Sequence, residues 1–164
     1  MELYERWLQN AADVGLYVME NIPFESQSKG FLCDNYIALN KNIETSTEKA
    51  CILAEEIGHY HTAAGNILNQ GERGDIANRK QEYKGRLWAY DNQIGLMGII
   101  SACKAHKQTL YEMADYLNVT ELFLKEALER YREKYGVCTT VDNYIVYFIP
   151  YLAVMEMYPT RNLP

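Results

Sequence analysis

The sequence predicts a mainly helical α+β domain, and three observations support this fold class. The chain has 164 residues, about the length of one domain. Apolar residues recur at helical spacing in several segments, which predicts amphipathic helices. Shorter runs rich in Tyr, Val and Ile, near residues 16–41 and in the tail, are typical of strands. We therefore expect a single domain, residues 1–164, in which helices accompany a small amount of sheet.

The first part of the chain is expected to form a helix followed by a β-hairpin. Residues 2–14 place apolar side chains at helical spacing, and Gly15 closes this helix. The β-like run LYVME follows. The segment FLCDNYIALNK then reverses direction at Asp34-Asn35, which is typical of a small hairpin.

A long helix is expected to begin at Thr45, because the sequence from Thr45 to Glu48 is a capping box. In this pattern the threonine hydroxyl accepts a backbone hydrogen bond, and the Glu48 carboxylate reaches back to the start of the helix. The helix is expected to end near the start of a glycine-containing surface loop at residues 65–78. In an alternative interpretation this loop is a lid over a cleft, with Gly71 and Gly74 as hinges.

The remaining chain is expected to be helical until a β-like tail. Helices are expected at residues 79–93 and 96–105. Residues 104–136 have the rhythm of a helix-turn-helix pair, with its turn at residues 118–120. The tail, residues 137–164, is expected to form a β-hairpin or an extended edge.

The charge of the chain argues against a nucleic-acid partner. It holds 16 Lys and Arg residues against 22 Asp and Glu residues, a formal net charge of −6. A nucleic-acid binder needs a basic surface to neutralise phosphates. In the helix-turn-helix-like segment, six basic residues are balanced by six acidic ones. We therefore expect this pair to pack or to dock a protein, and we expect no direct contact with nucleic acid.

Several features indicate a reduced, cytoplasmic protein without a membrane partner. The N-terminus lacks the basic region of a secretion signal. The most apolar stretch, residues 143–155, is shorter than the roughly 20 residues that span a bilayer and is interrupted by Pro150. No two cysteines form a CxxC motif, and each lies in an apolar run, so all four are expected to be buried thiols: Cys33, Cys51, Cys103 and Cys138.

The candidate site lies in the helix that begins after Thr45. Glu55 and His59 are four residues apart, so they lie on one face of a helix, one turn apart. This is the geometry of the H-E-x-x-H zinc site, in which the first and fifth residues bind metal and the second accepts a proton from water. Here the pattern is E-E-x-x-H, with Glu55 first and Glu56 second. Glu82, near the start of a following helix, is the candidate third ligand.

A solvent-exposed charge pair is the alternative interpretation of this spacing. Two features favour a site. The carboxylates lie within an apolar frame, where unpaired charge is costly. Gly58 in a helix interior costs about 1 kcal/mol relative to alanine, which indicates that another group comes close to that turn. His61 lies about 200° around the helix from His59. We expect Tyr60 and His61 to contribute mainly to packing, with stabilisation of the oxyanion as the alternative, and we expect Trp88 to pack in the core.

The segment LAEEIGHYHT, between KGFLCDNYIALNKNIETSTEKACI and RKQEYKGRLWAYD, resembles the ImmA/IrrE family of metallopeptidases. The similarity is to the short forms found in phages and integrative elements of Gram-positive bacteria. It extends over nearly the whole chain, including TLYEMADYLNVTELFLKEALERYREKYG and DNYIVYFIPYL. The resemblance implies a gluzincin-like domain with an E-E-x-x-H active-site helix. It also implies cleavage of a DNA-binding repressor, which releases a mobile element or a stress response.

The resemblance also assigns roles to individual residues. Glu56 matches the general base, His59 a metal ligand, and Glu82, in E-x-x-G-x-x-W-A, the third ligand. Glu55 replaces the first histidine ligand. This second carboxylate lowers the charge of the metal centre by one, which weakens its Lewis acidity. Three outcomes are open: a reduced peptidase activity, a preference for harder metal ions, or a vestigial site. The expected cofactor is Zn²⁺, with Mn²⁺ or another divalent ion as alternatives.

Two functional hypotheses follow for residues 1–103, the part that carries the site. The first is a zinc-dependent endopeptidase that cleaves a phage-type DNA-binding repressor, with water activated by the metal and Glu56 as general base. The second is a non-catalytic, metal-free protein that binds the repressor through a degenerate peptidase site. A DNA-binding regulator is a third interpretation, which the charge of the chain does not favour.

Overall fold

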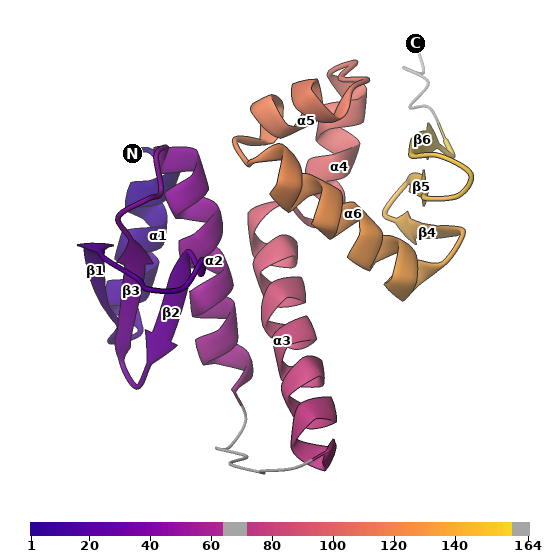
Figure 1. Ribbon diagram of the computed structural model, residues 1–164. Helices are drawn as coiled ribbons and strands as arrows, with labels where there is room; N and C mark the ends of the chain where they lie inside the picture. Colours follow the sequence, from indigo (N-terminus) through magenta and orange to yellow (C-terminus); the bar gives the residue numbers. More distant parts are fainter. Residues whose placement is uncertain (64–71, 159–164) are drawn as a thin grey trace. The chain divides into compact units, whose positions relative to one another are not determined.

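The computed structural model describes residues 1–63 and 72–158, in which the chain forms two compact units (Figure 1). The first unit comprises Met1–Gln93 and Asn118–Thr120, and the second comprises Ile94–Leu117 and Glu121–Pro164. The described residues form six helices and six strands, with one three-stranded sheet in each unit. This agrees with the expected α+β class. None of the helices in the described part is both long and apolar enough to span a membrane.

The sheet of the first unit has the strand order β1-β3-β2. Strands β2 (Gly30–Cys33) and β3 (Tyr36–Asn40) are antiparallel and joined by a turn in which Asp34 has a φ of 51°. This confirms the hairpin predicted at Asp34-Asn35. Strand β1 (Tyr17–Ile22) pairs with β3 in parallel, so β2 lies at one edge of the sheet. The parallel pairing is not predictable from the local sequence pattern.

Helices α1 (Leu3–Asp13) and α2 (Ser46–Thr62) confirm two of the predicted helices. The Thr45 side chain accepts a 3.1 Å hydrogen bond from the backbone N–H of Glu48, as expected for an N-cap. The second half of the predicted capping box is replaced by another interaction. The Glu48 carboxylate accepts from Lys29 Nζ at 2.6 Å, and this links the residue before β2 to the first turn of α2.

Helix α3 (Glu72–Gln93) corrects the prediction of a loop at residues 65–78. Residues 72–78 are helical, so Gly74 lies within a helix and is not a loop hinge. Residues 64–71, including Gly71, lie outside the described part of the chain. The prediction gave too much weight to glycine, because one interior glycine costs only about 1 kcal/mol and a 22-residue helix easily tolerates it.

The second unit contains three helices and the antiparallel sheet β4-β5-β6. The sheet agrees with the β-like tail predicted from residue 137. Helices α5 and α6 are separated by residues 118–120, with Asn118 at a φ of 53°, as the spacing predicts. The elements are α4 (Gly95–Lys104), α5 (Leu110–Leu117), α6 (Glu121–Tyr135), β4 (Cys138–Val141), β5 (Tyr144–Tyr147) and β6 (Ala153–Glu156).

The core of the first unit lies between its sheet and its helices. Alternate residues of the strands and the inner faces of α1, α2 and α3 supply its apolar side chains. The fully or nearly fully buried ones include Trp7, Ala11, Leu16, Ile37, Leu39, Ala50, Leu53, Ala54, Ile57, Ala89 and Tyr90. Because α2 contributes Leu53, Ala54 and Ile57 to this core, its site residues are held on a fixed element.

The cysteines only partly match the prediction of buried thiols. All four are free; Cys51 is buried and Cys103 is half-buried, but Cys33 and Cys138 are exposed. Both exposed cysteines lie in short strands, where successive side chains alternate between two faces. An apolar neighbour in a strand therefore does not indicate that the cysteine itself points inward.

We expect the four thiols to react with a soluble disulfide reagent in three separate phases. Cys33 and Cys138 react first and Cys103 more slowly. Cys51 reacts only after unfolding, because burial raises its pKa to about 12 and leaves little thiolate, the nucleophilic form, at neutral pH. The release of the coloured thiol is followed with and without denaturant, and Cys33→Ser and Cys138→Ser each remove one fast equivalent. A single phase for all four thiols would contradict this assignment.

Candidate active site

Two glycines bring helices α2 and α3 into close contact. A Cβ atom on Gly58 would clash with the carbonyl oxygen of Gly85, and it would lie 3.2 Å from Cε3 of Trp88. A Cβ atom on Gly85 would clash with the imidazole of His59. The close approach predicted at Gly58 is therefore confirmed, and the approaching group is the backbone of α3.

This packing places His59 of α2 beside Glu82 of α3. His59 Nε2 lies 3.3 Å from Glu82 Oε2. Burial lowers the pKa of His59, and the charge of Glu82 raises it in part; the net effect is a lowered pKa. The imidazole is therefore held in its neutral form, which has a nitrogen lone pair available for a metal ion.

Arg86 is a site residue that the sequence analysis missed. Its Nε donates a 2.7 Å hydrogen bond to Glu82 Oε1, so the two oxygens of Glu82 face different partners. Burial acts to lower the pKa of Arg86, but the charges of Glu55 and Glu82 and the hydrogen bond from Arg86 to Glu82 together raise it. The only sequence signal was the i,i+4 spacing of Glu82 and Arg86, which is common on exposed helices.

Glu56 lies directly beneath the edge strand β2. A Cβ atom on Gly30 would come within 2.6 Å of Ile52 Cγ2 and 2.7 Å of Glu56 Oε1, so only glycine fits there without a shift. Burial raises the pKa of Glu56 to about 7; the charge of Glu82 also raises it, and that of Arg86 lowers it. A carboxyl group with this pKa is suited to accept a proton near neutral pH.

The four predicted site residues line one cavity of about 560 Å³ within the first unit. His59 and Glu82 are in contact, whereas Glu55 and Glu56 line the α2 side. Among the described residues, no three His, Cys, Asp or Glu side chains form a group arranged to hold a metal ion. The cavity is lined by Ser28, Lys29, Gly30, Phe31, Leu32, Ile52, Glu55, Glu56, His59, Ala63, Asn78, Gln81, Glu82 and Arg86.

Strand β2 presents its free edge along this cavity. The backbone N–H of Asn40 donates to the carbonyl of Lys29 at 2.9 Å, which places residues 29, 31 and 33 in the hydrogen-bonded pairs with β3. The backbone groups of Gly30 and Leu32 therefore point outward. The Gly30 carbonyl accepts from Ser28 Oγ at 2.8 Å. Such an edge is where an extended peptide adds to a sheet.

The aromatic residues near the site contribute to packing, as predicted. His61 stacks on Trp88 with ring centroids 4.7 Å apart, and Trp88 lies 6.0 Å from Trp7. The Tyr60 hydroxyl donates to the Val14 carbonyl at 3.5 Å. His61 therefore contacts α3 away from the pair of His59 and Glu82.

The donors present fit two ligand positions of a divalent ion. Two ligands at about 2.05 Å from a tetrahedral ion are separated by roughly 3.3 Å. The distance between His59 Nε2 and Glu82 Oε2 is also 3.3 Å. A neutral imidazole and a carboxylate are common ligands of zinc. Glu55 borders the same cavity and is the remaining candidate for a third ligand.

A family comparison agrees with this geometry. The model of the Peptidase M78 family, described as the IrrE N-terminal-like domain, matches residues 11–129. The chain belongs to this family. The resemblance to ImmA/IrrE metallopeptidases is thereby confirmed, and the M78 assignment indicates a metallopeptidase-type function with a protein substrate. The match includes α2 and α3, and therefore all of the predicted site residues. No curated protein and no solved structure matches the chain.

We expect Gly85→Ala to lower the free energy of unfolding by about 1–3 kcal/mol, the usual cost of overpacking. The added methyl group would collide with the His59 ring and force α2 and α3 apart. Urea unfolding measures the loss. Gly98→Ala in α4 is the matched control, because its methyl group would come no closer than 3.3 Å to another side chain. Equal effects of the two substitutions would contradict the tight packing inferred at Gly85.

Proposed function

We propose that this protein is a metal-dependent endopeptidase that cleaves a phage-type DNA-binding repressor. The observation that carries the proposal is the arrangement of three residues in one cavity. Glu56 lies half-buried beneath an edge strand, and His59 and Glu82 approach each other at the separation of two ligands on one ion. General base, metal ligands and a strand edge for a peptide are the parts that metal-assisted peptide hydrolysis requires.

Each residue of the chain has a separate task in this proposal. His59 and Glu82 would hold the ion, with Glu55 as the third ligand. Arg86 holds one oxygen of Glu82 and leaves the other facing His59, so that the carboxylate is oriented before an ion binds. Glu56 takes the proton from the attacking water and passes it to the leaving amine. When bound, the divalent ion supplies the positive charge that activates water and polarises the peptide carbonyl.

Glu55 changes the charge of the proposed centre relative to a site with two histidines. Its carboxylate adds one negative charge, which weakens the Lewis acidity of a bound ion. Arg86 lines the same cavity and adds one positive charge, and its raised pKa reflects the field of Glu55. The chain therefore contains a nearby cation that offsets the additional carboxylate.

The proposed substrate also fits the charge of the protein. The chain carries a net charge of −6, and three carboxylates lie at the cavity. A repressor that binds DNA carries a basic surface, which neutralises phosphates. Attraction between opposite charges speeds the association of such a pair.

A second candidate is a metal-free protein that binds the repressor without cleaving it. The hydrogen bond from Arg86 to Glu82 favours this candidate, because a guanidinium already neutralises the proposed ligand. The two candidates differ in metal content.

We expect the protein purified without chelator to contain about one equivalent of Zn²⁺ or Mn²⁺ per chain. Glu82→Ala removes a ligand and the metal with it. Glu133→Ala, in an exposed ion pair with Arg130, is the control and retains the metal. Elemental analysis by mass spectrometry measures each protein. A wild-type protein without metal would support the second candidate.

We expect Glu56→Gln to abolish cleavage of a purified phage-type DNA-binding repressor, with a loss of at least about 100-fold, because an amide replaces the general base. Gel analysis of the repressor over time measures cleavage, and circular dichroism checks the fold. Glu133→Gln changes a carboxylate that pairs with Arg130 away from the cavity, so it is the control and keeps its activity. Cleavage by the Glu56→Gln protein would contradict the assignment of the base.

A further inference from the structure

The first sheet has an outer face without charged side chains across two rows of paired residues. Met19, Ala38 and Phe31 form one row across β1, β3 and β2. Tyr17, Tyr36 and Cys33 form the next row. Because side chains alternate along a strand, both rows lie on the same face, opposite the buried Ile37 and Leu39. We define the aromatic sheet face as Tyr17, Met19, Phe31, Cys33 and Tyr36.

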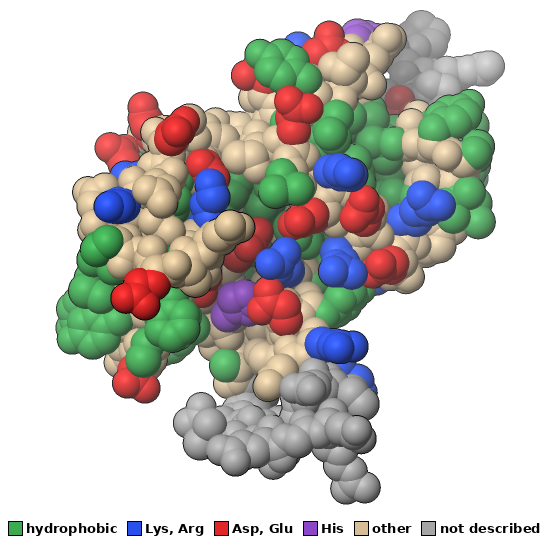
Figure 2. Space-filling model, viewed as in Figure 1, with side chains coloured by type: hydrophobic (Ala, Val, Ile, Leu, Met, Phe, Trp, Pro, Cys, Tyr) green, Lys and Arg blue, Asp and Glu red, His purple; other side chains and the backbone are tan. Residues whose placement is uncertain are grey.

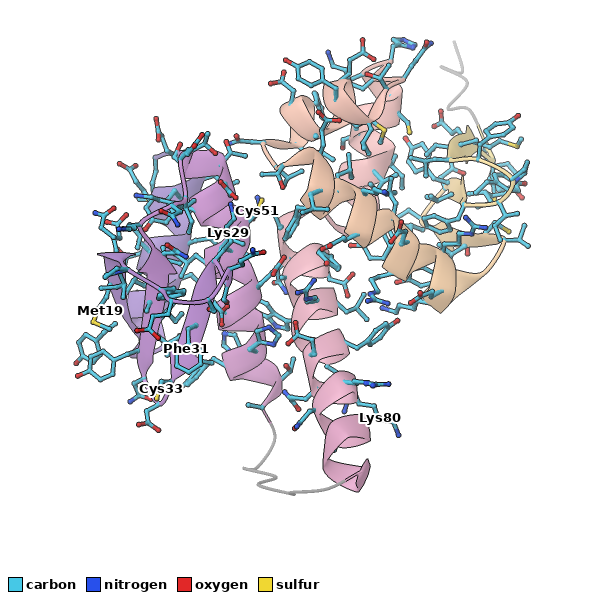
Figure 3. The ribbon with its side chains drawn as sticks, viewed as in Figure 1. Met19, Lys29, Phe31, Cys33, Cys51 and Lys80 are labelled. Carbon is cyan, nitrogen blue, oxygen red and sulfur yellow. The ribbon has the colours of Figure 1, made fainter. Side chains whose placement is uncertain are left out.

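This face is exposed although it is largely apolar. The exposed fractions are 62% for Tyr17, 42% for Met19, 59% for Phe31 and 50% for Tyr36. The rings of Tyr17 and Tyr36 stack at 5.3 Å, which gives the face a flat, ordered part. Hydrophobic side chains gather over this sheet in the space-filling view, and Met19, Phe31 and Cys33 lie together at the sheet (Figures 2 and 3). An exposed apolar patch of this kind marks an interaction site.

Phe31 connects the aromatic sheet face with the candidate active site. It lines the 560 Å³ site cavity and also a neighbouring pocket of about 310 Å³. Ser28 also lines both cavities, and Phe24 lines the smaller one. A chain that lies along the edge of β2 in the site cavity therefore passes directly onto Phe31 and the face beyond it.

We propose that the aromatic sheet face binds an apolar segment of the same protein substrate whose scissile segment enters the site cavity. This inference rests on the proposed function and adds a second contact, outside the cavity, that selects the substrate. The partner is a basic protein with an amphipathic segment, whose apolar side chains cover Tyr17, Met19 and Tyr36.

The size of the face favours a substrate segment over a second copy of this chain. With roughly 200 Å² for each fully exposed aromatic side chain, the three aromatic residues leave roughly 350 Å² in water. A stable protein interface buries about 800 Å² on each partner. The face alone is too small for a stable dimer. As an addition to contacts already made in the cavity, an area of this size increases affinity and selectivity.

Thiol footprinting tests the proposal without changing the face. The Glu56→Gln protein is mixed with a purified phage-type DNA-binding repressor and alkylated with iodoacetamide. The alkylation rate at each cysteine is measured by mass spectrometry. Cys33 lies on the face, whereas the exposed Cys138 lies in the second unit and serves as an internal control. We expect the repressor to slow alkylation of Cys33 at least fivefold and to leave the rate at Cys138 unchanged.

A paired variant supplies a kinetic readout. Tyr17→Gln with Met19→Gln removes apolar surface from residues that do not line the site cavity. We expect KM for the intact repressor to rise at least tenfold with kcat unchanged, and the cleavage of a short peptide that spans the cut site to stay the same. Leu122→Gln, at an apolar position of 66% exposure in the second unit, is the matched control and leaves all of these values unchanged.

The outcomes separate this proposal from the proposed function. If wild-type protein does not cleave the repressor but the repressor protects Cys33, the docking face stands and the catalytic proposal fails. If the repressor is cleaved while Cys33 stays unprotected and the paired variant keeps its KM, the docking proposal is overturned. It is also overturned if the repressor neither binds nor is cleaved. A dimer in sedimentation equilibrium that the paired variant dissociates would assign the face to a second copy and overturn it too.

Discussion

The contact between helices α2 and α3 at Gly58 and Gly85 is the constraint on which the site depends. The absence of two side chains lets the α3 backbone reach the surface of α2. His59 is held against Gly85, and Glu82, one turn earlier on α3, then faces the imidazole at 3.3 Å. Catalytic groups must be held within a fraction of an ångström of their working positions, and two packed helices achieve this better than loops.

Strand β2 is packed just as closely against helix α2. Gly30 leaves just enough room for Glu56 and Ile52 below it. The result is a half-buried carboxyl group partly covered by strand β2, and this loss of solvent is the main cause of its raised pKa. Arg86 then acts as the counter-charge to carboxylates contributed by both helices. The close packing of β2, α2 and α3 therefore determines both the positions of the site residues and the shifts in their pKa values.

Local signals in the sequence predicted much of this arrangement. The hydroxyl of Thr45, the turn at Asp34 and the interior glycine at Gly58 each act over a few residues, and each was predicted correctly. The roles of Glu55, His59 and Glu82 as metal ligands and of Glu56 as general base stay predictions. The parallel pairing of β1 with β3, the contribution of Arg86 and the exposure of Cys33 were not predicted, because they depend on contacts between distant segments. The helix at residues 72–78 was missed because the three glycines and mixed charge of residues 65–78 favoured a loop.

The location of the cavity has a consequence for the evolution of the chain. All of its lining residues lie between positions 28 and 86, in the first unit, and the described residues of the second unit contribute none. Selection for the chemistry of the site therefore acts directly on about one third of the sequence, positions that also build the core of the first unit. Substitutions in the described part of the second unit therefore change none of the residues that line the cavity.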